Sequence, residues 1–187
     1  MTDHLHRICS VLVAATLVST SAHAAPDTAL QLAVGTGYRH SFTQDAGGFS
    51  LDVSVGARVG VFSVDVQSRL SNDHTFRKVD QRLAARNTTW LSLGAFIPGR
   101  RVQVGIVAGP GIGWVHHAGP AWENGGRFTS MGVHEELRLD LNATDDDFGL
   151  GVRLYLGAEH LWQSAVVPAP DHAILAGFSV WFGPRER

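Results

Sequence analysis

Apolar and polar side chains alternate strictly over residues 49–58, which read FSLDVSVGAR. The same period returns over residues 62–69, which read FSVDVQSR. Successive side chains of an extended strand point to opposite faces, so this pattern predicts two strands that each have one apolar and one polar face. The connection between them, residues 58–61, is short, as expected where a turn joins two antiparallel strands.

Six further segments alternate in the same way: 29–39, 89–97, 102–114, 129–142, 148–160 and 173–182. The connections are short at 58–61, 98–101 and 144–147, and long at 40–48, 71–88, 115–128 and 161–171. Short turns at one end and long loops at the other are typical of up-and-down membrane barrels. The sequence therefore predicts an all-β fold, an eight-stranded antiparallel up-and-down transmembrane β-barrel.

The overall composition agrees with a folded chain of nearly neutral net charge. Lys and Arg total 15 and Asp and Glu total 17 among 187 residues, a net charge of −2 that excludes nucleic-acid binding by bulk charge. Hydrophobic residues make up 44% and charged residues 17%, which argues against disorder. Cys9 is the one cysteine and lies in a predicted leader, so a mature chain would hold no disulfide and no thiol nucleophile.

Residues 1–24 read as a secretory signal peptide. Arg7 gives the positive start, residues 8–18 form an apolar run too short to span a bilayer, and Ala22 and Ala24 supply the small residues before a cleavage site. We expect cleavage before Ala25, a barrel formed by residues 25–187, and delivery to the outer membrane of a Gram-negative bacterium.

Aromatic residues favour a membrane barrel over a soluble sandwich or lipocalin-like barrel, in which the apolar face would point inward. Two interfacial girdles are expected of a membrane barrel. The first comprises Tyr38, Trp90, Trp114 and Trp162 near the long loops, and the second comprises Phe62, Phe96, Phe148 and Phe182 near the short turns.

The polar face carries five arginines and five carboxylates, which would line the lumen. They are Arg39, Asp52, Arg58, Asp65, Arg69, Glu136, Arg138, Asp140, Arg153 and Glu159. Unpaired buried charge is costly, and the planar guanidinium can bridge two carboxylates. We expect a paired, side-chain-filled plug, with a narrow ion path as the alternative.

The alternation over the whole mature chain, with its last strand closing near Phe182, resembles the small eight-stranded families of the OmpA transmembrane domain, OmpX and OmpW. We expect a non-enzymatic protein that acts in envelope integrity or binds through its outer loops. Its expected partners are outer-membrane lipid, lipopolysaccharide and, during biogenesis, the barrel assembly machinery. The OmpW resemblance implies transport of small hydrophobic solutes as an alternative, which would need an apolar lumen mouth.

A second resemblance concerns His160, which has lipid-facing parity in the seventh strand. PagL-like lipid A deacylases place a His-x-Ser pair in that strand, and the resemblance implies hydrolysis of a lipid A or phospholipid acyl ester. Trp162 stands where the serine of the motif would be. The remaining catalytic candidates are Ser164 as nucleophile and Asp171 as acid.

Two loop features complete the candidate sites. The long loop at 71–88 carries Arg77, Lys78, Arg82 and Arg86, a cationic set suited to lipopolysaccharide phosphates. We place all seven histidines of the mature chain in outward loops or outer strand ends, namely His40, His74, His116, His117, His134, His160 and His172. Their spacing matches no known ligand motif, so we expect no metal and no cofactor.

Overall fold

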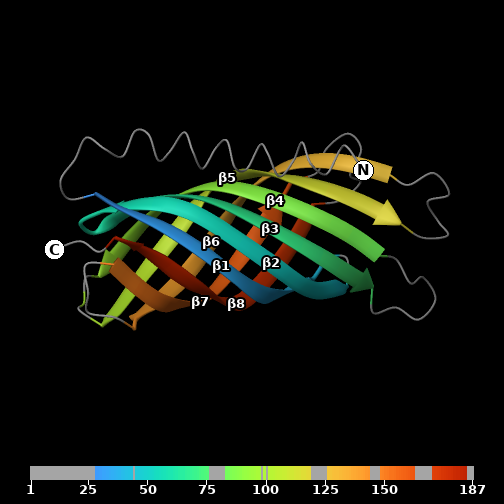
Figure 1. The fold of residues 1–187 in the computed structure, drawn as a ribbon. Helices are drawn as coiled ribbons and strands as arrows, with labels where there is room; N and C mark the ends of the chain where they lie inside the picture. Colours follow the sequence, from blue (N-terminus) through green and yellow to red (C-terminus); the bar gives the residue numbers. More distant parts are fainter. Residues whose placement is uncertain are drawn as a thin grey trace, which may run out of the picture.

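The computed structural model describes residues 28–43, 45–75, 83–97, 99, 101–118, 126–143, 148–162 and 170–184. The strands are β1 (Thr28–Ser41), β2 (Ala46–Val59), β3 (Phe62–Thr75), β4 (Leu83–Ile97), β5 (Val102–Ala118), β6 (Gly126–Asn142), β7 (Phe148–Leu161) and β8 (Asp171–Pro184). Each strand pairs with the next, and β8 pairs with β1 to close the barrel (Figure 1). The predicted eight-stranded antiparallel barrel is confirmed. The predicted leader lies outside the described residues.

The two ends of the barrel differ. We call the end with the connections β2–β3, β4–β5 and β6–β7 the turn end, and the opposite end the loop end. At the loop end the strands run further than predicted: β3 continues to Thr75 and β4 begins at Leu83. Strands of 14–17 residues exceed the roughly 9–11 that cross a bilayer. Beyond the apolar band the outward side chains are no longer consistently hydrophobic, so the alternation of apolar and polar residues fades. The strands nevertheless remain paired there. Within the described ranges, no helix is long and apolar enough to span a membrane.

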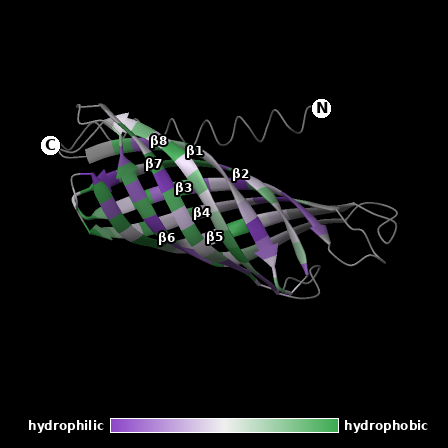
Figure 2. Cartoon of the chain, turned by 90° about the horizontal axis from the view of Figure 1, so that it is seen from below, coloured by the Kyte–Doolittle hydropathy of each residue, from purple (hydrophilic) through white to green (hydrophobic). Residues whose placement is uncertain are grey.

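The polarity of the two faces is inverted relative to a soluble protein. Large apolar side chains lie on the outside, such as Phe49 at 77% exposure, Leu93 at 66% and Leu156 at 57%. Arginines and carboxylates of the alternate positions are buried inside. Along each strand green and purple residues therefore alternate in Figure 2. A contiguous apolar surface of this extent marks contact with a partner or with lipid.

Four inward aromatic side chains pack over glycines of neighbouring strands, among them Trp90 and Phe96. The girdle positions predicted for these two residues are wrong. Trp90 is 0% exposed and Phe96 is 5% exposed, and the Arg58 guanidinium carbon lies 3.8 Å from the Phe96 ring centroid. Both share the inward parity of Ser92 on β4, so the alternation itself places them in the lumen.

The ring of Tyr155 fills the space that Gly37 and Gly177 leave open on β1 and β8. A Cβ built at Gly177 would lie 2.3 Å from the Tyr155 hydroxyl oxygen and 2.6 Å from the Thr36 carbonyl oxygen. We therefore expect Gly177→Ala to lower the free energy of unfolding by about 1–3 kcal/mol, measured by urea titration in lipid vesicles.

Gly113→Ala is the matched control. The nearest atom to its added methyl is the flexible end of Leu161, at 3.0 Å. Its cost should be clearly smaller, and equal losses in both variants would show that the Tyr155 contact does not limit packing.

Candidate functional site

The structure places all ten predicted lumen residues inside the barrel, each no more than 4% exposed and each in at least one ion pair. It adds Asp73, Arg86 and Asp171 to them. Among the described residues, six arginines and seven carboxylates are thus buried in the lumen. These thirteen side chains form the candidate site, here called the lumen network.

Arg69 on β3 occupies the middle of the lumen network. Its guanidinium nitrogens lie 2.7 Å from Asp52 Oδ1, 2.9 Å from Glu136 Oε1 and 2.6 Å from Glu159 Oε1. The Tyr155 hydroxyl donates a hydrogen bond to the other oxygen of Asp52. One arginine from β3 therefore ties together carboxylates from β2, β6 and β7.

Arg138 on β6 extends this centre. Its Nε lies 2.9 Å from Glu136 Oε2 and its Nη1 lies 2.8 Å from Asp65 Oδ2. Its Nη2 donates to Gln67 Oε1 at 3.2 Å, and Gln67 in turn donates to Glu136 at 3.1 Å. These bonds satisfy the guanidinium on three sides, as a buried charge requires.

A second group lies toward the loop end. Arg39 contacts Asp73 at 2.6 Å, Asp171 at 2.5 Å and Glu159 at 3.1 Å. Arg86 pairs with Asp171 and lies 3.4 Å from Asp73. Because Glu159 also binds Arg69, the loop-end group and the centre form one continuous chain of ion pairs.

A third group lies toward the turn end. Asp140 accepts from Arg153 Nε at 2.8 Å and from Arg58 Nη2 at 3.1 Å. Arg58 also donates to the Gln103 side chain. These residues come from β2, β5, β6 and β7 and hold that end of the lumen.

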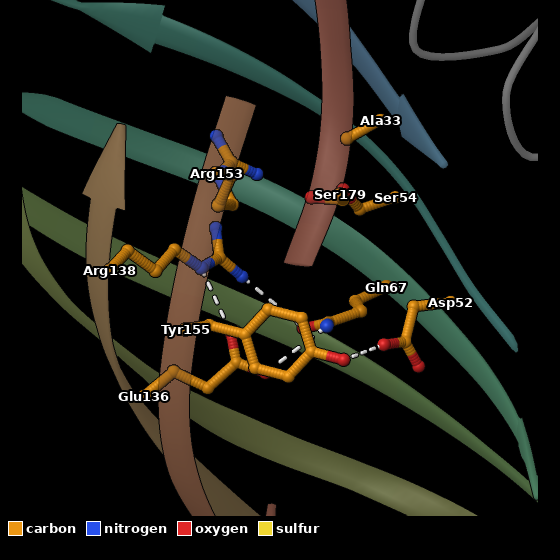
Figure 3. Close-up of a pocket in the computed structure, with 9 residues that line it drawn as sticks. All are labelled: Ala33, Asp52, Ser54, Gln67, Glu136, Arg138, Arg153, Tyr155 and Ser179. Carbon is orange, nitrogen blue, oxygen red and sulfur yellow. Dashed lines mark hydrogen bonds and ion pairs between the residues drawn. The ribbon is translucent and has the colours of Figure 1, made fainter. Parts of the chain in front are cut away.

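A cavity of about 10 Å³ separates Arg153 from the central group. Nine residues line it, among them Arg138, Arg153 and Tyr155 (Figure 3). This volume is about the room of one water molecule, so the lumen is filled here by side chains rather than by a solvent path.

Two sequence assignments need correction. Arg86, expected to contact lipopolysaccharide, is 2% exposed and bound to Asp171 inside the barrel, because β4 begins before it and gives it inward parity. Asp171, the candidate catalytic acid, also points inward and is 2% exposed. His160 points outward, so these two residues lie on opposite faces. Arg77, Lys78, Arg82 and Ser164 lie outside the described residues.

The predicted position of His134 is also wrong. It lies in the middle of β6, is 1% exposed, and its Nε2 is 3.3 Å from Ser92 Oγ. Its ring centroid is 5.0 Å from that of Trp90. Both partners are buried in the lumen, with Ser92 at 0% exposure. Within the described residues, no group of three or more His, Cys, Asp or Glu side chains is arranged to hold a metal ion.

Sequence reasoning missed Asp73 and Asp171 because it ended the alternation too early. Continuing the inward parity of β3 from Arg69 by four residues reaches Asp73, and continuing that of β8 back from Ala173 reaches Asp171. Counting every second residue along the strand would therefore have found both carboxylates. The apolar residues that normally mark a strand do not continue that far.

Comparison with solved structures supports the fold. Neisserial surface protein A (NspA) is similar with a TM-score of 0.59 and 12% identity, over 84% of this chain and 96% of that chain. The N-terminal β-barrel domain of Pseudomonas aeruginosa OprF is similar with a TM-score of 0.60 and 14% identity, over 84% and 97%. Both are small outer-membrane barrels of eight strands. No family model matches the chain, and no curated protein sequence matches it.

Proposed function

We propose that this chain is a non-enzymatic outer-membrane barrel with a closed lumen, which acts in envelope integrity or binds through its outer loops. The observation that carries the proposal is the lumen network, in which six arginines and seven carboxylates are buried against one another. A lumen of this width is about filled by its own side chains. The outer surface and the loop end are then the regions through which the protein would act.

The proposed partners follow from the two faces. The exposed apolar outer face suits lipid, and insertion would require signal-peptide export and the barrel assembly machinery. Arg77, Lys78 and Arg82 remain the cations that we propose to contact lipopolysaccharide phosphates at the loop end. The alternative of small hydrophobic solute transport is disfavoured because the loop-end lumen holds Arg39 and Asp171 rather than apolar side chains.

A closed lumen gives a direct test. Liposomes that contain the refolded barrel should swell in small sugars no faster than empty liposomes, because paired charges and side chains fill the interior. Stopped-flow light scattering measures the rate, and a large general porin provides the positive control. Reproducible sugar entry through the heat-modifiable, folded protein would contradict the proposed plug.

The enzymatic alternative gives a second test. The mass spectrum of lipid A from cells that express the folded chain should match that of the vector control. Trp162 occupies the expected serine position, and Asp171 lies on the other face from His160. Loss of an acyl chain with the wild type but not with His160→Ala would make the protein a deacylase instead.

A further inference from the structure

Three polar side chains form a cluster on the apolar outer face: Glu135 on β6, His160 on β7 and His172 on β8. His160 Nδ1 lies 2.9 Å from His172 Nδ1, and His160 Nε2 lies 4.0 Å from Glu135 Oε1. The Glu135 and His160 side chains are 67% and 36% exposed. The cluster is therefore open to the surroundings of the barrel and separate from the lumen network.

The strand pairing fixes the two imidazoles. His160 and His172 lie directly opposite each other in the β7–β8 register. The backbone of His172 is held on its other side, since its N–H donates to Thr43 Oγ1 at 3.2 Å and its carbonyl accepts from the Phe42 N–H at 2.9 Å. The ring centroids are 5.1 Å apart with planes at 60°. This holds the two Nδ1 atoms within hydrogen-bond distance of each other.

We propose that His160 and His172 bind one late divalent transition-metal ion, Cu²⁺ before Ni²⁺ or Zn²⁺, between their Nδ1 atoms. With metal–nitrogen bonds of about 2.0 Å, two ligand nitrogens stand about 2.8 Å apart at a right angle and about 3.3 Å apart at a tetrahedral angle. The observed 2.9 Å separation lies within this interval. Imidazole suits these metals, and Cu²⁺ binds most tightly along the series.

Glu135 completes the arrangement as a positioning residue. Ligating imidazoles usually donate their other N–H to a carboxylate, which fixes the tautomer and raises the basicity of the ligand nitrogen. The ring that donates in the metal-free pair shifts its proton from Nδ1 to Nε2 when the ion takes its place. On His160 that Nε2 atom lies 4.0 Å from Glu135 Oε1, within ion-pair range but longer than a hydrogen bond. A carboxylate on an apolar outer face is costly without an opposite charge nearby, and the ion supplies that charge.

The site offers two protein ligands at the loop end of β7 and β8, where water would fill the remaining positions. This agrees with the finding that no set of three or more metal-ligating side chains gathers in the described part of the chain. The proposal does not depend on the closed lumen, because its residues lie on the other face of the sheet. It can fail while the proposed function stands, and the reverse also holds.

The test is Cu²⁺ titration of the folded barrel in detergent, followed by electron paramagnetic resonance. We expect a site with nitrogen hyperfine splitting from two imidazoles. His160→Ala and His172→Ala should each weaken binding at that site at least tenfold, and Glu135→Gln should weaken it several-fold. His74→Ala is the matched control, because it removes an exposed histidine of the same loop-end surface on β3.

Heat-modifiable gel migration confirms that each variant is folded before titration. Retention of the two-imidazole spectrum at wild-type affinity in the His160→Ala/His172→Ala double variant would overturn the proposal. So would an equal loss in His74→Ala, which would show that Cu²⁺ binds surface histidines without selection.

Discussion

Arg69→Ala is expected to lower the free energy of unfolding by about 3–5 kcal/mol, because removing one partner of a buried ion pair leaves an uncompensated charge. Here a single substitution takes an ion-pair partner from three carboxylates. Asp52 loses the arginine that pairs with it, whereas Glu136 keeps Arg138 and Glu159 keeps Arg39. Arg69 is 1% exposed, so the carboxylates that lose it lie away from bulk water. Urea-induced unfolding in lipid vesicles, followed by tryptophan fluorescence, measures the loss.

Two further variants separate the electrostatic cause from a simple loss of volume. Adding Asp52→Asn to Arg69→Ala removes the charge that has lost its ion pair and should recover part of the stability, so the two substitutions should be non-additive. Leu70→Ala changes the adjacent, outward-facing residue of β3, which is 56% exposed, and should cost much less. A loss below about 1 kcal/mol in Arg69→Ala, the range of exposed pairs, would mean that water reaches the lumen and would contradict the plug.

The alternation predicted the strands, their order and the inward set because a strand has a strict period of two. Reading Asp52, Arg69 and Glu159 as lumen residues needs no knowledge of their partners. The same rule places Trp90 in the lumen when it is applied without regard to residue type. The girdle assignment failed at Trp90 and Phe96 because aromatic character was given more weight than parity.

The pairing within the lumen network could not be predicted in this way. Arg39 binds Asp73, Glu159 and Asp171, which are separated from it by 34, 120 and 132 residues in sequence. Which charges meet depends on the tilt and stagger of all eight strands, because these set the height of each side chain along the barrel axis. Parity assigns a side chain to the lumen, whereas the closed sheet determines its neighbours.

The second prediction with a large expected effect concerns the exposed apolar residues of β7. Leu154→Arg is expected to lower the free energy of unfolding in bilayers by about 2–4 kcal/mol, the cost of a cationic side chain near the bilayer midplane. Leu154 is 42% exposed and its paired residues, Leu139 on β6 and Phe178 on β8, leave it in a wholly apolar neighbourhood. Reversible unfolding from lipid vesicles in guanidinium chloride measures the effect.

The matched control is Ile97→Arg, at the turn end of β4. Ile97 is 72% exposed, more than Leu154, so an arginine there should lose fewer protein contacts whether or not lipid is present. In a bilayer the depth of the residue matters as well, because arginine near the interface costs only about 0–1 kcal/mol. We therefore expect Ile97→Arg to be much less destabilising than Leu154→Arg in vesicles. Repeating both variants in detergent micelles removes the fixed hydrocarbon thickness and should shrink the difference between them. If Leu154→Arg were as harmless as Ile97→Arg in vesicles, the apolar outer face would not lie in hydrocarbon, and the membrane placement on which the proposed function rests would fail.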